Sequence, residues 1–244
     1  MGCTVLLLAA AYLWGIQTVL TLEYVHMGRK PEILWITPQS LLNLAVSQTE
    51  GTKLSNAGFE FEVPWNDLNA ANITRRDSVA VFIFRSGIGI SFLSPGTNLI
   101  SGMKTQSPSS EALEGVRRLL GDSATQSDYA LRNAILDASP EMLKPWISKR
   151  EAIRVRTLLS IKESIDSGHG GTGIFRIGAN DWKGFQFDDP VQKPGRVLID
   201  LYDSQDHHIE MVFQTPKDAS TEVTQADINR AIGTLRAVGP DISQ

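Results

Sequence analysis

Cysteine is almost absent from this sequence, since Cys3 is the only one in 244 residues. A single thiol cannot form an intramolecular disulfide or a cysteine-based metal cage, which excludes disulfide-stapled folds and zinc fingers. Basic residues do not predominate either: 23 Lys and Arg stand against 27 Asp and Glu, for a net charge of −4. A dedicated nucleic-acid binder needs a concentrated basic surface, so we expect no nucleic-acid partner.

Catalytic and cofactor motifs are also missing. The sequence has no G-x-S-x-G nucleophile elbow, no phosphate-binding loop and no glycine-rich dinucleotide fingerprint that follows a predicted strand and opens a helix. Residues 167–172 contain a His-Gly-Gly run of the kind that donates backbone N–H groups to an oxyanion in some esterases. Without an elbow, we interpret this run as a helix-to-strand connection. We therefore expect no catalytic residue, no resident metal and no cofactor.

Charge is missing from one long stretch near the N-terminus. Residues 3–22 carry no charged side chain and are mostly apolar. A helix of this length rises about 30 Å, enough to cross a hydrocarbon core. A cleaved signal peptide is the alternative, but no Lys or Arg precedes the run, and the small-residue motif at 9–11 comes too early for cleavage. We predict a single-pass transmembrane anchor within residues 1–24, with the membrane as partner.

The side of the membrane is a separate question. Arg29 and Lys30 follow the apolar segment, and the positive-inside rule read literally places the next domain in the cytoplasm. An anchored domain that faces outward is a common arrangement for such chains. We favour the extracytoplasmic side on that ground.

After the anchor we expect a connector at residues 25–50 and one soluble domain at residues 51–244. Apolar and acidic residues alternate over 59–63, a pattern typical of a half-buried strand that Pro64 ends. The apolar run 78–84 predicts a central strand, and 90–93 is expected to pair back on it. Later strands are predicted at 174–177, 185–187, 197–202 and 209–213.

Helices are predicted between and after the strands. Their start signals are Ser109, Ser127, Ser148 and Thr224, each followed by apolar residues at helical spacing. Ser148 with Glu151 has the spacing of a capping box. We expect helices over 109–120, from 127 to 138, over 148–165 and from 224 to 238. The order favours an α+β fold, with a mostly antiparallel sheet and helices packed on one face, preceded by the transmembrane helix.

Two neighbouring segments carry a resemblance to known proteins. The segments Gly51-Thr-Lys-Leu-Ser55 and Phe59-Glu-Phe-Glu-Val-Pro-Trp65 resemble a group of uncharacterised bacterial membrane-anchored proteins. The layout of residues 50–240 is similar to the PsbP/Mog1-like fold. The resemblance implies a non-catalytic binding or assembly role, and it supplies no active-site residues.

The densest group of possible ligands lies near residue 200. Its members are polar side chains that donate oxygen or nitrogen: Asp200, Asp203, Asp206, His207 and His208. Convergence of these donors would suit a transition metal. However, Asp203 and Asp206 fall where a hairpin turn needs short polar residues, and adjacent histidines in a strand point to opposite faces. We therefore favour a solvent-exposed hairpin turn over a metal site.

Other candidates stand alone in the sequence. Arg85 follows an apolar strand, where it can clamp a carboxylate or phosphate or simply lie on the surface. Trp182, in a turn, suits either a partner anchor or a plug over the core. The helix at 148–165 is basic, which suits an acidic partner, anionic lipid headgroups or a solvated face. The basic residues are Lys149, Arg150, Arg154, Arg156 and Lys162.

These observations lead to one functional hypothesis with two alternatives. The first is a membrane-anchored, non-catalytic interaction or accessory domain, with a membrane-associated protein as a further partner. Its ligand- or partner-binding residues would be Arg85, Trp182, His207 and His208. The alternatives are a membrane-anchored hydrolase with a carboxylate/His site near 200–208, and a small-ligand binding protein.

Overall fold

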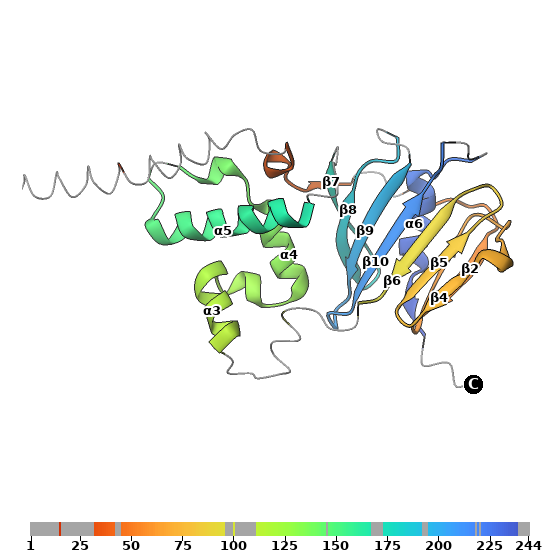
Figure 1. The fold of residues 1–244 in the computed structure, drawn as a ribbon, viewed down its shortest axis with the longest axis horizontal. Coiled ribbons are helices and arrows are strands. Elements are labelled where there is room, and N and C mark those ends of the chain that lie inside the picture. Colours follow the sequence, from red (N-terminus) through yellow and green to blue (C-terminus); the bar gives the residue numbers. More distant parts are fainter. Residues whose placement is uncertain are drawn as a thin grey trace, which may run out of the picture. The chain divides into compact units, whose positions relative to one another are not determined.

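Contacts along the chain group it into two compact units, each assembled from two separate stretches (Figure 1). The helical unit comprises residues 1–37 and 103–170, and the sheet unit comprises residues 38–102 and 171–244. The division predicted from the sequence, with an anchor at 1–24, a connector at 25–50 and a soluble domain at 51–244, stays a prediction. The computed structural model describes residues 15, 32–41, 45–95, 100, 111–144, 146–166, 173–191, 195–217, 219 and 221–238.

Several sequence predictions fall outside these described residues. They are the anchor at 3–22 apart from Gly15, the helix start at 108–110, the glycine-rich run 167–172 and the chain end beyond 238. Among the helices that can be described, none is both long enough and apolar enough to cross a membrane.

An eight-stranded sheet forms the body of the sheet unit, in the order β1-β7-β8-β9-β10-β6-β5-β4. Every neighbouring pair is antiparallel except β1 with β7. The α+β class with a mostly antiparallel sheet is therefore confirmed. The strands are β1 (Gln39–Ser40), β4 (Thr74–Arg76), β5 (Val79–Ile83), β6 (Gly89–Leu93), β7 (Ile174–Ala179), β8 (Trp182–Phe187), β9 (Arg196–Tyr202) and β10 (His208–Gln214).

The apolar run at 78–84 forms β5, but its predicted central position was wrong. β5 is next to the edge strand β4. Its burial alternates, so that Ala80 and Phe82 are buried while Val79 and Ile83 are exposed. A continuous apolar run does not reveal whether one or both faces of the strand are buried. The sequence therefore could not give the position of this strand in the sheet.

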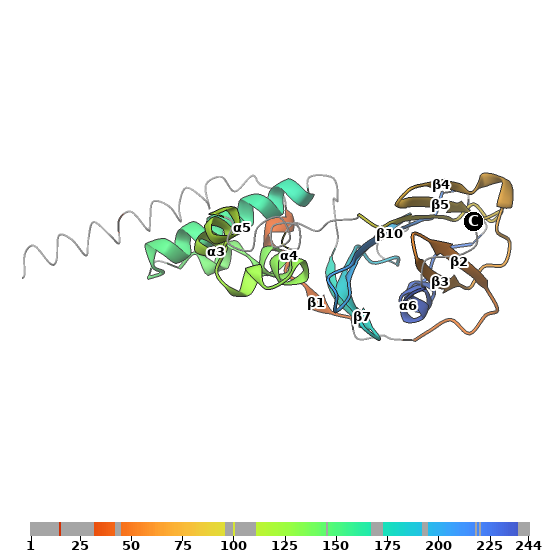
Figure 2. The same ribbon diagram turned by 90° about the horizontal axis from the view of Figure 1, so that it is seen from below.

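A three-stranded sheet and one helix cover a single face of the large sheet. Figure 2 shows β2 (Thr52–Asn56), β3 (Phe59–Val63) and α6 (Gln225–Thr234) together on that side. The shared core is rich in aromatic rings, with Phe61 stacked on Phe92 at 5.5 Å between ring centres. Thr224, a predicted helix start, caps α6, where it forms a capping box with Asp227.

The end of α6 corrects the sequence prediction. The helix stops at Thr234 rather than continuing to Val238. Arg236 and Ala237 instead form a short strand, β11, which pairs with Glu60 and Phe59 of β3. Val238 continued the helical spacing of apolar residues and so suggested a longer helix. The backbone of Arg236 and Ala237 instead forms hydrogen bonds with the free edge of β3.

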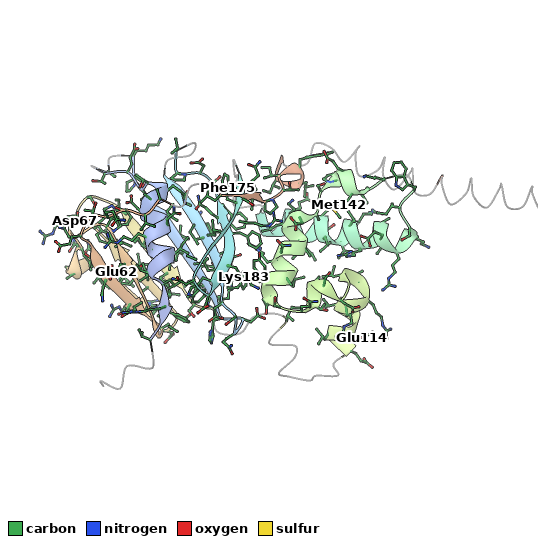
Figure 3. The ribbon with its side chains drawn as sticks, turned by 180° about the vertical axis from the view of Figure 1, so that it is seen from behind. Glu62, Asp67, Glu114, Met142, Phe175 and Lys183 are labelled. Atoms are coloured by element: carbon green, nitrogen blue, oxygen red, sulfur yellow. The ribbon has the colours of Figure 1, made fainter. Side chains whose placement is uncertain are left out.

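Within its described residues, the helical unit has three α-helices with printed bounds and three short 3₁₀ segments. The helices are α3 (Glu111–Leu120), α4 (Asp128–Asp137) and α5 (Lys149–Asp166), and the 3₁₀ segments are η1 (Glu32–Trp35), η3 (Ser123–Thr125) and η4 (Pro140–Met142). Two start signals are confirmed: Ser127 Oγ accepts from the backbone N–H of Ala130, and Ser148 Oγ accepts from that of Glu151. Figure 3 labels Glu114 on α3 and Met142 on η4.

Two basic side chains of α5 point inward and cap other elements. Lys162 is fully buried, and its Nζ donates to the carbonyl oxygens of Ile36, Leu136 and Ala138 at 2.7, 2.8 and 2.8 Å. Arg154 Nε donates to the carbonyl of Leu120 at 2.7 Å. These carbonyls end η1, α4 and α3, where helices leave acceptors without internal partners. Lys162 and Arg154 therefore do not lie on a solvated basic face of this helix.

Candidate functional site

The turn between β9 and β10 is organised by one carboxylate. Asp203 Oδ1 accepts from the backbone N–H groups of Gln205 and His207, each at 2.8 Å. Its second oxygen lies 2.7 Å from Nδ1 of His207. Asp206 has a positive φ of 64°, a conformation that Asp tolerates well. The turn chemistry expected of Asp203 and Asp206 is confirmed.

The two adjacent histidines take different directions, as strand geometry predicts. The ring of His207 makes an edge contact with Phe59 in the core, at 6.0 Å between ring centres. The ring of His208 stacks on Tyr202, at 4.6 Å and 4° between the ring planes. Only His208 is therefore placed beside Asp200.

Register brings four polar side chains together on two paired strands. Asp200 lies opposite Glu210, and Tyr202 lies opposite His208. His208 Nε2 hydrogen-bonds to Asp200 Oδ1 and lies 3.9 Å from Glu210 Oε1. Tyr202 donates its hydroxyl proton to Asp200 Oδ2 at 3.4 Å. We call Asp200, Tyr202, His208 and Glu210 the hairpin cluster.

Burial is graded across the hairpin cluster. The side chain of Asp200 is 2% exposed, that of His208 14% and that of Glu210 37%. Lys183 of β8, labelled in Figure 3, lies opposite Tyr202 and is exposed. A carboxylate as buried as Asp200 requires a hydrogen-bonding or charged partner, and His208 and Tyr202 supply it.

No family model, curated protein or solved structure matches this chain. The resemblance of residues 51–55 and 59–65 to uncharacterised membrane-anchored proteins therefore stays a prediction, as does the similarity of residues 50–240 to the PsbP/Mog1-like fold.

The hairpin cluster has the donors for two kinds of chemistry. A carboxylate that holds one imidazole nitrogen is the orienting pair of a general base. In the described residues, the His208 ring nitrogen Nε2 is hydrogen-bonded to Asp200 Oδ1. Two carboxylates and an imidazole on one face also match the ligand set of a divalent transition metal.

Arg85 and Trp182 do not join the hairpin cluster. Arg85 is exposed just beyond β5, at the end of the sheet opposite to the 203–207 turn. Trp182 is 5% exposed and packs against Phe59 in the core, at 5.8 Å between ring centres. Phe59 thus joins Trp182 to His207. Binding roles for Arg85, Trp182 and His207 remain predictions.

Two members of the hairpin cluster, Tyr202 and Glu210, were not predicted from the sequence. The usable signal was spacing: Asp200 with Tyr202, and His208 with Glu210, are two residues apart on strands joined by a short turn. Such pairs share a face, but whether they face each other depends on register. The last strand was predicted to begin at Ile209, which assigned His208 to the turn, whereas β10 begins at His208.

The helical unit carries a second candidate surface, formed by Met142, Lys144, Trp146, Lys149 and Arg150. All five residues are exposed, and Trp146 most of all, at 78%. Lys144 Nζ lies 6.0 Å from the centre of the Trp146 ring. We call these residues the indole–cation surface. Glu141 is the exposed acidic residue in the same stretch.

A cavity of about 250 Å³ lies between β7 and α6 in the sheet unit. Its lining is mainly apolar, from Leu41, Val46, Ile177, Gly178, Ala179, Asn229, Ile232 and Gly233. Asn229 donates from Nδ2 to the carbonyl of Ala45 at 2.8 Å, which ties the chain before β2 to α6.

Proposed function

We propose that this chain is a non-catalytic accessory domain held at a membrane by residues 3–22, whose indole–cation surface lies against anionic lipid. The observation that carries this proposal is the exposure of Trp146 beside Lys144, just before the basic start of α5. An indole has an apolar body and one polar N–H, which favours the interface between hydrocarbon and water.

The charges of this surface suit a lipid headgroup layer. Lys144, Lys149 and Arg150 carry three positive charges, against one negative charge on Glu141. Arg154 is not available to the surface, because it bonds Leu120 and Glu151. Basic side chains close to an anionic leaflet gain from its negative potential, and exposed apolar groups such as Met142 add burial.

We expect the indole–cation surface of the full chain to contact vesicles that contain anionic lipid. Because Cys3 is the sole cysteine, the double variant Cys3→Ser, Met142→Cys accepts one environment-sensitive dye at the surface. After reconstitution, dye emission should shift to the blue in phosphatidylglycerol-containing vesicles but not in pure phosphatidylcholine, and high salt should reverse the shift. The chain should stay with the vesicles through an alkaline carbonate wash.

Charge reversal gives this test its control. Adding Lys149→Glu and Arg150→Glu to the labelled chain should abolish the shift. Reversal of Arg75 and Arg76, exposed on β4 of the sheet unit, should leave the shift unchanged. Equal emission in both kinds of vesicle would show that the surface has no preference for anionic lipid and would contradict the proposal. Release by carbonate would show that residues 3–22 do not anchor the chain.

A second candidate function is the binding of a small apolar ligand, favoured by the cavity between β7 and α6. We expect a probe such as 1-octanol to raise the melting temperature, because a ligand that binds only the folded state stabilises it. A Cβ at Gly233 would meet no atom within 4 Å, so Gly233→Leu should fill the cavity without a clash at that atom. An unchanged melting temperature in the native chain, or the same rise in the filled variant, would count against a ligand here.

A further inference from the structure

We propose that Asp200, His208 and Glu210 of the hairpin cluster bind one divalent transition metal ion. One ligand atom from each residue lies within 4.8 Å of the other two. Metal–ligand bonds of about 2.0–2.2 Å place neighbouring donors roughly 3–3.5 Å apart in a tetrahedral site. Small rotations of side chains that are already neighbours would therefore close the site.

The donor set favours a borderline transition metal over magnesium or calcium. Mg²⁺ and Ca²⁺ prefer sites made of oxygen alone, whereas an imidazole favours Zn²⁺, Co²⁺ or Fe²⁺. Two ionised carboxylates balance the charge of a divalent ion when His208 is neutral. Three protein ligands leave a fourth coordination position open to water, whereas purely structural zinc sites have four protein ligands.

The cluster also contains the outer groups that hold metal ligands in place. Tyr202 hydrogen-bonds Asp200 Oδ2, while Oδ1 is the oxygen that lies next to His208. The same phenol ring stacks on His208 and fixes the plane of the imidazole. Partners of this kind orient the ligands, and their loss typically weakens metal binding about 10–100-fold.

The alternative is that a proton occupies the place of the metal. His208 Nε2 is then a hydrogen-bond donor to Asp200, and the cluster is a polar contact within the sheet. A metal ion needs the lone pair of that nitrogen and displaces the proton. The two accounts therefore differ in whether the chain binds Zn²⁺ and in whether that binding depends on His208.

The test uses the full chain in detergent micelles after removal of metals with a chelator. Titration calorimetry with Zn²⁺ should show one site, and Co²⁺ should produce a visible absorption band that Zn²⁺ removes. We expect His208→Ala to weaken Zn²⁺ binding by at least ~100-fold and Tyr202→Phe by about 10-fold, the latter as an outer partner. His207→Ala is the matched control, because its ring points toward Phe59, and should leave affinity unchanged.

Folding is controlled with a milder variant. Glu210 is the most exposed ligand, so Glu210→Gln should fold normally and still lose affinity. Far-UV circular dichroism checks each variant. Absence of Zn²⁺ binding by the native chain, equal binding by His208→Ala, or an equal loss in His207→Ala would each overturn the proposal. The outcome is independent of whether the helical unit contacts lipid.

Discussion

Replacement of Lys162 by methionine is expected to destabilise the helical unit by about 3–5 kcal/mol, because two buried carbonyls and one partly buried carbonyl then lose their partner. The ammonium group donates all three of its protons, to the carbonyls of Ile36, Leu136 and Ala138. Methionine has a similar length and keeps the apolar stem, so the loss reports the hydrogen bonds rather than a cavity. Amide hydrogen exchange in α4, measured by mass spectrometry, would locate the loss within the helical unit.

The exposed Lys149 of the same helix provides the control for this prediction. Lys149→Met removes the same charge from α5 at a position that faces solvent, and little change in stability is expected. A loss below about 1 kcal/mol in Lys162→Met would mean that water replaces the ammonium group at these carbonyls. The capping role assigned to Lys162 would then be wrong.

Gly184→Ala is expected to lower the stability of the sheet unit by roughly 3 kcal/mol through a backbone clash. A Cβ at Gly184 would lie 1.8 Å from the carbonyl oxygen of Asp200 and 2.9 Å from Cα of Leu201. Both atoms belong to the backbone of β9, so β8 and β9 must separate locally to admit the methyl group. Urea-induced unfolding would measure the loss.

Gly233→Ala in α6 is the matched control, and its expected effect has the opposite sign. A Cβ there meets nothing within 4 Å, and alanine is the better helix former, which favours a gain of about 0.4–1 kcal/mol. Gly184→Ala also displaces Asp200, so a variant that still folds should bind Zn²⁺ more weakly if the metal proposal holds. Equal stability of Gly184→Ala and the native chain would show that β8 and β9 are not held this closely.

Local patterns in the sequence predicted most elements because their causes are local. The alternation over 59–63 gave β3, and Ser127, Ser148 and Thr224 marked helix starts with the hydrogen bonds that the structure contains. The late strands were also placed well, and each extends beyond its predicted range. Capping and alternation depend on neighbours within a few residues, which a single sequence displays directly.

Features that depend on distant partners could not be obtained in this way. Glu210 lies beside Asp200 only because of the β9–β10 register, and β11 exists only because β3 has a free edge. Lys162 looked like one of several surface cations until the ends of η1 and α4 were placed around it. Its helical position predicts a face, but not which neighbour covers that face.

The interleaving of the two units sets the order in which the chain can fold as it is synthesised. β6 pairs with β10, yet the helices of the other unit lie between them in the sequence. At typical synthesis rates, β6 therefore waits roughly ten seconds for its partner strand to emerge. During that interval β4, β5 and β6 form a meander with an open edge, which can mispair with other chains. Slow synthesis or an overloaded folding machinery should therefore produce aggregates seeded by residues 74–93.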